Sequence, residues 1–139
     1  GPTGSGLASF GYVYDLAILA NATIAGGSDV PFSDNGPLTN ITHVAGSTTI
    51  TVVTTGIYEI FYSVSFTAGL NASFALTVNG TVDASTPVPA LVSVGEIAGQ
   101  AILSLVAGDL ITLRNNSLIS AVLALSPSVG AQFTIIRLN

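Results

Sequence analysis

The sequence has no Cys, Met or Trp, and only 6% of its 139 residues are charged. Without cysteine, the chain can form neither a disulfide nor a thiolate metal site. Average soluble domains carry about 25% charged residues. The surface of this protein must therefore be covered by uncharged polar residues, or be removed from water by association.

Positive charge is especially scarce, because Arg114 and Arg137 stand against seven acidic residues and the formal net charge is −5. Binding to nucleic acid or to an anionic bilayer depends on clustered Lys and Arg, so we exclude both classes of partner. The apolar stretch 97–113 is interrupted by Gly, Gln, Ser and Asp. A membrane-spanning helix needs about 20 apolar residues in succession, and we predict no membrane insertion.

Residues with catalytic or metal-binding chemistry are few and scattered. His43 is the only histidine and no Gly-x-Ser-x-Gly motif occurs, which excludes a multi-histidine metal site and a nucleophile elbow. Glu59 and Glu96 fall in a strand and a turn, which does not indicate a glycosidase carboxylate pair. Asp29 and Asp34 lack the register of a calcium loop. We predict no enzyme, no cofactor and no metal site, with an ion on an oligomer axis left open.

From residue 10 onward the chain is rich in β-branched, aromatic and small residues, with turn formers at short intervals. This composition predicts an all-β domain, and the spacing of the short strands is typical of a sandwich, jelly roll or barrel. The expected strands are 10–19, 41–44, 49–53, 56–67, 73–78, 91–94, 97–105, 110–115, 118–125 and 132–138.

The side-chain pattern within these segments carries further predictions. In 57–66, one face of the strand is wholly apolar and the other is mixed, as expected beside a core. Asn79-Gly80 predicts a type I′ hairpin, and 26–37 is expected to be a long exposed loop. Segments 101–106 and 120–125 are apolar on both faces. Because a two-layer sandwich buries one face of each sheet, the extra apolar surface predicts an oligomer.

The first residues, Gly1-Pro2-Thr3-Gly4, have the glycine spacing of a collagen triple helix. We interpret residues 1–6 as the end of a collagen-like Gly-X-Y stalk, or else as a remnant of an expression vector, and 7–139 as a single domain. Thr3 is a candidate O-glycan site on such a stalk. The five Asn-x-Ser/Thr sequences are interpreted as turn-forming asparagines.

The order of several motifs resembles the globular head of the C1q and tumour-necrosis-factor superfamily. The positions that carry this resemblance are Ile50, Gly56, Tyr58, Gly108, Asp109 and Phe133. Ile50 and Ile60 stand where aromatic residues are usual, and Ile135 stands where glycine is usual. Asp29-Val30-Pro31-Phe32, Val78-Asn79-Gly80 and the low charge are similar to the C-terminal domain of BclA-type collagen-like glycoproteins of bacterial spores.

The resemblance implies a jelly-roll homotrimer at the tip of a collagen-like stalk, on the extracellular surface of the outermost spore layer, the exosporium. The function it implies is structural, namely trimerisation and surface display, with adhesion as a further role. The alternative is a ligand-binding head that recognises a host receptor, a carbohydrate or a complement component. The candidate ligand loop for that alternative comprises Asp29, Pro31, Phe32 and Asp34.

Overall fold

A computed structural model describes residues 8–139, so the expected stalk residues 1–6 lie outside the described part of the chain. Strands are the only regular elements over this range. They are β1 (Phe10–Asp15), β2 (Thr23–Ile24), β3 (Asp34–Thr39), β4 (Ile41–Thr42), β5 (Ile50–Val52), β6 (Gly56–Ala68), β7 (Ser73–Val78), β8 (Thr81–Val82), β9 (Val88–Pro89), β10 (Gly95–Leu105), β11 (Leu110–Asn115), β12 (Ala121–Leu123) and β13 (Ala131–Arg137).

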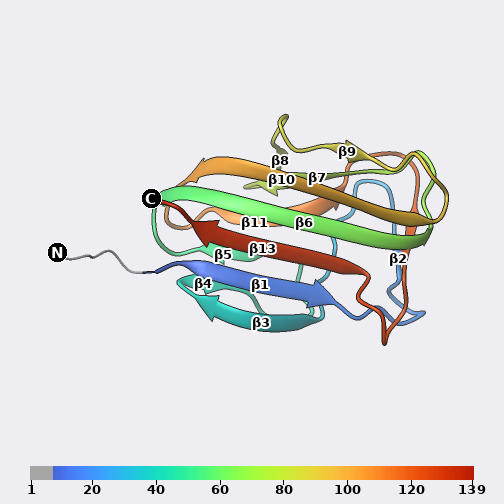
Figure 1. Cartoon of the computed structure of the whole chain (residues 1–139), viewed down its shortest axis with the longest axis horizontal. Coiled ribbons are helices and arrows are strands. Elements are labelled where there is room, and N and C mark those ends of the chain that lie inside the picture. Colours follow the sequence, from blue (N-terminus) through green and yellow to red (C-terminus); the bar gives the residue numbers. More distant parts are fainter. Residues whose placement is uncertain (1–7) are drawn as a thin grey trace.

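The strands form two antiparallel sheets. The large sheet runs β10-β6-β13-β1-β3, and β12 with β2 continues it beyond β13 along the same edge of β6 (Figure 1). The small sheet runs β4-β5-β11-β7-β8, with β9 also paired to β7. The all-β, two-sheet prediction is confirmed.

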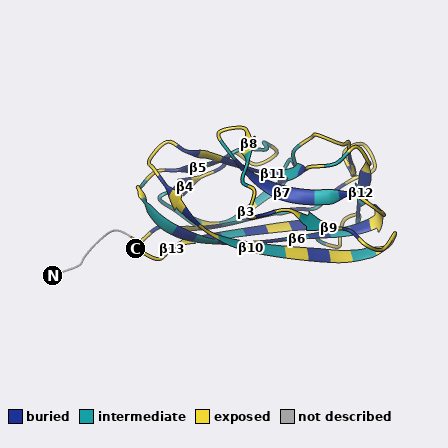
Figure 2. Cartoon of the chain, turned by 90° about the horizontal axis from the view of Figure 1, so that it is seen from above, coloured by how far each residue is buried: buried dark blue, intermediate teal, exposed yellow. Residues whose placement is uncertain are grey.

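The core lies between the two sheets and depends on the alternation of β6. Its residues Tyr58, Ile60, Tyr62, Val64 and Phe66 have at most 2% of their surface exposed, while the residues between them point away from the core. The alternating bands are visible along β6 and β10 in Figure 2. The apolar face that the sequence pattern assigned to 57–66 is thus the core face.

The expected strands 10–19, 91–94 and 118–125 depart most from the structure. β1 ends at Asp15 instead of residue 19, and 118–125 contains only the three residues of β12. The predicted strand 91–94 does not form, and Leu91 and Val94 are 77% and 66% exposed. These predictions were wrong because they took apolar residues as evidence of burial in a sheet, whereas here the aliphatic side chains lie on loops.

The segment 26–37 is not the exposed loop that its Gly, Ser, Asp and Pro content predicted. Its last residues begin β3, which pairs with β1, and Val30 and Phe32 are completely buried. The backbone N–H of Val30 donates to Leu113 O at 2.8 Å. The content of turn-forming residues led to the wrong prediction because the strands that hydrogen-bond to this segment, β1 and β11, are distant from it in the sequence. Pro37 is compatible with β3 because β3 is an edge strand.

The Asn79-Gly80 hairpin between β7 and β8 is confirmed, and both residues have the positive φ of a type I′ turn, at 52° and 83°. The Asn79 side chain donates to Asp109 Oδ1 at 2.9 Å and accepts from the Leu110 N–H at 2.9 Å. The turn is therefore joined to the Gly108-Asp109 turn between β10 and β11.

Gly99 on β10 lies directly over the ring of Tyr62, and a Cβ at this position would overlap the phenol. The Tyr62 side chain extends across the core, and its hydroxyl donates to the carbonyl oxygen of Thr86. Burial raises the pKa of this phenol to about 12. The close approach of β10 to the core thus depends on the absence of a side chain at residue 99.

We predict that Gly99→Ala lowers the free energy of unfolding by about 1–3 kcal/mol, because the added methyl group must displace a buried ring. Chemical denaturation measures this change. In a Tyr62→Leu background the same substitution should lower stability by much less, since the overlapping atoms are gone. Equal losses in both backgrounds would contradict the steric explanation.

Asp15 is a buried carboxylate at the end of β1, with 1% of its surface exposed. One oxygen accepts the Ser33 N–H at 3.3 Å, and the other has no hydrogen-bond partner. Burial raises the pKa of this carboxyl above its usual value, and the hydrogen bonds from Ser33 only partly oppose the shift.

A raised native-state pKa stabilises the fold while Asp15 is protonated, and this contribution is lost as pH rises through the native pKa. We therefore predict that, between pH 3 and 7, the unfolding free energy of the wild type falls relative to that of Asp15→Asn, by about 1.4 kcal/mol per unit of pKa shift. Calorimetry at one protein concentration tests this.

Asp83→Asn is the matched control for the pH dependence. Hydrogen bonds from the Ser85 side chain and backbone lower the pKa of Asp83. The wild type should therefore gain stability relative to this variant as pH rises, which is the opposite sign. The same sign for both variants would contradict the assignment.

Candidate assembly face

The outer side of the large sheet has no layer of the described chain packed over it, and we call it the assembly face. It consists of the outward-pointing side chains of β10, β6, β13 and β1. They are Glu96, Ala98, Gln100, Ile102, Ser104, Ile57, Glu59, Phe61, Ser63, Ser65, Gln132, Thr134, Ile136, Phe10, Tyr12 and Tyr14.

Large apolar side chains on this face are exposed to water. Phe10, Phe61 and Ile136 are each about two-fifths exposed and Ile102 is 62% exposed. The outward positions of β7 and β11 on the other sheet carry mostly small or polar residues: Ala75, Thr77 and Thr112 are buried, Arg114 is partly exposed, and Leu110 is 43% exposed. Exposed apolar surface of this extent marks an interaction site.

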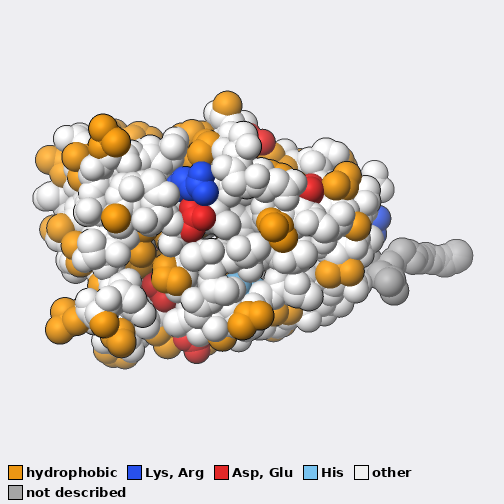
Figure 3. Space-filling view, turned by 180° about the vertical axis from the view of Figure 1, so that it is seen from behind, with side chains coloured by type: hydrophobic (Ala, Val, Ile, Leu, Met, Phe, Trp, Pro, Cys, Tyr) orange, Lys and Arg blue, Asp and Glu red, His pale blue; other side chains and the backbone are white. Residues whose placement is uncertain are grey.

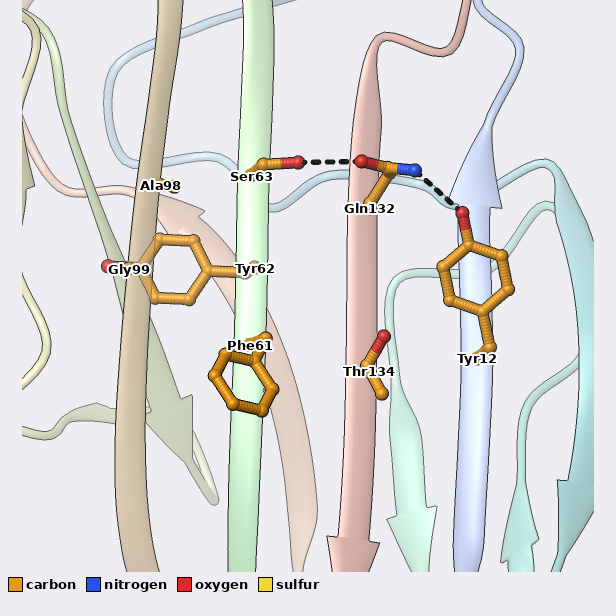
Figure 4. Close-up of a pocket in the computed structure, with 8 residues that line it drawn as sticks. All are labelled: Tyr12, Phe61, Tyr62, Ser63, Ala98, Gly99, Gln132 and Thr134. Atoms are coloured by element: carbon orange, nitrogen blue, oxygen red, sulfur yellow. Dashed lines mark hydrogen bonds between the residues drawn. The ribbon is translucent and has the colours of Figure 1, made fainter.

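The polar groups at the centre of the face bond to one another across three strands. Ser63 donates to Gln132 Oε1 at 3.0 Å, and the Gln132 amide donates to the Tyr12 hydroxyl at 2.8 Å (Figure 4). The Tyr12 ring stacks on Tyr14 with centroids 5.5 Å apart. Because these donors already have partners, an apolar surface can cover them at a smaller desolvation cost.

The face also has a hollow and a free edge. A hollow of about 350 Å³ lies among Phe10, Tyr12, Pro37 and Ile136, which is room for several side chains of a partner. At the opposite margin, the strand β10 is paired only with β6 among the described strands. An unpaired edge of 11 residues invites pairing with another chain unless a partner or another device covers it.

The residues that carried the superfamily resemblance have structural positions away from this face. Ile50, Tyr58 and Phe133 are buried in the core, with at most 1% exposure. Gly56 begins β6 in contact with the chain end, and a Cβ there would lie 2.6 Å from Asn139 O.

The last two resemblance positions form the turn between β10 and β11. Gly108 has a φ of +94°, which disfavours a side chain. Asp109 accepts the Val106 N–H at 2.8 Å through Oδ2 and the Asn79 amide through Oδ1. All six positions thus maintain the sandwich itself.

The candidate ligand loop is tied to the small sheet. Asp29 forms an ion pair with Arg114 at 2.8 Å, and this hydrogen bond raises the pKa of the guanidinium. Phe32 packs against Phe133 and is fully buried, which corrects its placement in an exposed loop. Asp34 accepts the Ser33 hydroxyl at 2.6 Å. A ligand-binding role for Asp29, Pro31 and Asp34 stays a prediction.

The remaining ionisable groups do not converge. His43 is buried, with Nε2 2.8 Å from Ser47 O and Nδ1 on the Asn35 side chain. Residues 8–139 hold no group of three or more His, Cys, Asp or Glu arranged to bind a metal. Within the same range, no helix is long and apolar enough to cross a bilayer.

Sequence reasoning placed the extra apolar surface on 101–106 and 120–125 and missed the contribution of β1 and β13. A signal was available, because Phe10, Tyr12 and Tyr14 alternate with Gly11 and Val13 and so share one side of a strand. β13 was harder, since only its pairing with β6 and β1 puts Gln132 beside Tyr12.

Comparison with protein families gives a match to the BclA C-terminal domain over residues 17–139. The chain belongs to this family. BclA C-terminal domains are non-catalytic, which agrees with the prediction that the protein is not an enzyme. Among curated protein sequences, none matches this chain.

Solved structures similar to this BclA C-terminal domain are tumour-necrosis-factor and complement heads. Eiger TNF from S. frugiperda aligns with a TM-score of 0.67 and 11% identity, covering 96% of this chain and 94% of that one. The globular domain of zebrafish complement 1qA gives 0.66 and 14%, covering 95% and 98%. Murine APRIL gives 0.65 and 18%, covering 94% and 99%. At these identities the likeness shows the fold, a C1q/TNF-like jelly roll, and confirms that prediction.

Proposed function

We propose that this domain is the trimerisation and display head of a collagen-like protein on the outer, exosporium surface of bacterial spores. The observation that supports the proposal is the assembly face, on which Phe10, Phe61, Ile102 and Ile136 are exposed and uncovered in the single chain. A protein with 6% charged residues needs such a face to be hidden by copies of itself.

The proposed ring brings two different margins of the large sheet into contact. The hollow beside Phe10 and Pro37 lies at one margin of the large sheet, and the free edge of β10 with Ile102 lies at the other. A contact between two different surfaces is heterologous, and it closes into a ring if the rotation permits. The resemblance to C1q and tumour-necrosis-factor heads implies three copies. Each contact should bury more than about 1,000 Å².

The ends of the described chain suit attachment to a three-stranded stalk. β1 begins beside the end of β13, where Phe10 pairs with Ile136 and the Arg137 N–H donates to Ser9 O at 2.9 Å. Any segment that precedes residue 8 therefore joins the head at this end (Figure 1). In a ring of three heads, the three attachment points lie on the same side, as a collagen triple helix requires.

Light scattering coupled to size-exclusion chromatography tests the proposal. The wild type should have the mass of three 13.9 kDa chains. Phe61→Asp with Ile136→Asp should give single chains, because two carboxylates per copy would be buried without partners. Leu110→Asp is the matched control, since Leu110 is similarly exposed, at 43%, but lies on the small sheet. It should leave the mass unchanged.

Circular dichroism distinguishes dissociation from unfolding in these variants. If the double aspartate variant loses its β spectrum, Phe61→Ser with Ile136→Ser provides the milder test of the same contact. A wild type that remains a single chain at high concentration, or a double variant that folds and keeps the wild-type mass, would reject the assembly face.

A further inference from the structure

The end of the sandwich away from Phe10 and Arg137 is formed by five loops, which we call the distal tip. β1, β6 and β11 end there, and β7, β10 and β13 begin there. The loops comprise residues 16–22, 69–72, 90–94, 116–120 and 124–130. β6 has 13 residues, which at about 3.3 Å per residue separate the tip from the opposite end by roughly 40 Å.

Aliphatic side chains are unusually exposed on the distal tip. Leu118 is 99% exposed and Leu19 is 85% exposed. Leu91, Val94 and Ile18 follow, at 77%, 66% and 58%. Figure 3 shows hydrophobic side chains gathered at this end, on the left of the view. Single exposed aliphatics are common on proteins, but a group of this size at one end marks an interaction surface.

The composition of the tip limits what it can bind. None of its five loops contains an ionisable or an aromatic residue. Hot spots of protein interfaces are enriched in Trp, Tyr and Arg. Proteins that sit in lipid headgroups use Lys and Arg with Trp or Tyr. Because all these types are missing, the tip is suited to an uncharged surface that it contacts through dispersion and the exclusion of water.

Leu19 is held at the apex of a tight turn. The Asn21 N–H donates to Ile18 O at 3.0 Å, and Asn21 Oδ1 accepts the Ile18 N–H at 3.0 Å. Such positions are usually taken by Gly, Asn, Asp, Ser or Pro. Leucine at this position has almost no contacts within its own chain, so core packing does not explain its presence.

The loop that carries Leu118 is held in place by hydrogen bonds from the buried side-chain amide of Asn115. The Asn115 side chain donates to Ile24 O at 2.9 Å and to Ile119 O at 2.7 Å. Gly26 packs so closely against the loop that a Cβ there would lie 2.9 Å from the carbonyl carbon of Leu118. A side chain presented on a fastened loop loses little conformational entropy when it binds.

We infer that the distal tip is a contact surface for an uncharged hydrocarbon phase, to which it adheres through Leu19, Leu118 and their aliphatic neighbours. This inference rests on the proposed function for its direction, because a head held on a stalk at the opposite end presents this tip outward. It gives the display head a defined adhesive surface of its own, separate from the assembly face.

Partition of the folded protein between buffer and hexadecane droplets tests the inference. The wild type should bind the droplets, and added sodium chloride should not weaken binding. Leu19→Ser with Leu118→Ser should reduce binding at least about tenfold, since complete removal of even one leucine side chain from water changes affinity by more than a factor of ten. Val106→Ser with Leu138→Ser is the control, because both residues are about half exposed at the opposite end. It should bind as the wild type does.

The other outcomes reject the inference. Equal binding of the tip variant and the wild type would show that the tip does not make the contact. Binding to phosphatidylcholine vesicles without binding to hexadecane would assign the tip to lipid headgroups. A concentration-dependent increase in mass that the tip substitutions abolish, without hexadecane binding, would assign it to a second copy. Light scattering on the same samples tests the assembly face separately. If that face does not associate, the control variant and the tip variant will both have the mass of a single chain, whether or not they bind hexadecane.

Discussion

Strand β6 places its even-numbered and odd-numbered residues on opposite sides of the large sheet, and each side contributes to a different apolar surface. The even-numbered side supplies Tyr58, Ile60 and Tyr62 to the core. The odd-numbered side supplies Phe61 to the assembly face. One side is covered by the small sheet of the same chain. The other is the side through which the proposed assembly would form, so the monomer fold and the proposed assembly depend on the same strand.

The shortage of charge has consequences that vary over the surface. The small sheet is covered by hydroxyl and small side chains, with Arg114 and Asp29 bonded to each other. On the assembly face, Ser63, Gln132 and Tyr12 are hydrogen-bonded to one another. The distal tip has neither device and leaves its aliphatic side chains in water. Three regions of one surface therefore differ in how they meet their surroundings.

Much of the fold was predictable from local pattern. The alternation in 57–66 gave β6 and its core face, and Asn79-Gly80 gave the β7–β8 hairpin, because both signals are contained within a few residues. The predictions failed where partners are distant. β3 was missed because its pairing with β1 is not visible in a segment rich in Gly, Asp and Pro.

The candidate face was predictable in kind but not in place. Low charge and strands that are apolar on both sides indicated that copies associate, whereas locating the face required the order of β10, β6, β13 and β1. The opposite error occurred at 91–94, where aliphatic residues predicted a buried strand and the structure has an exposed loop. Hydrophobicity alone does not say whether a residue is covered by its own chain, by another copy, or not at all.

The position of β1 determines how the head would bear a mechanical load. β1 lies in the interior of the large sheet and is hydrogen-bonded along both sides, to β13 and to β3. A pull from its N-terminal end, resisted by contact at the far end, acts along the strand axis. Such a force shears many hydrogen bonds simultaneously instead of unzipping them one after another. A strand placed in this way is suited to withstand traction applied at its N-terminal end.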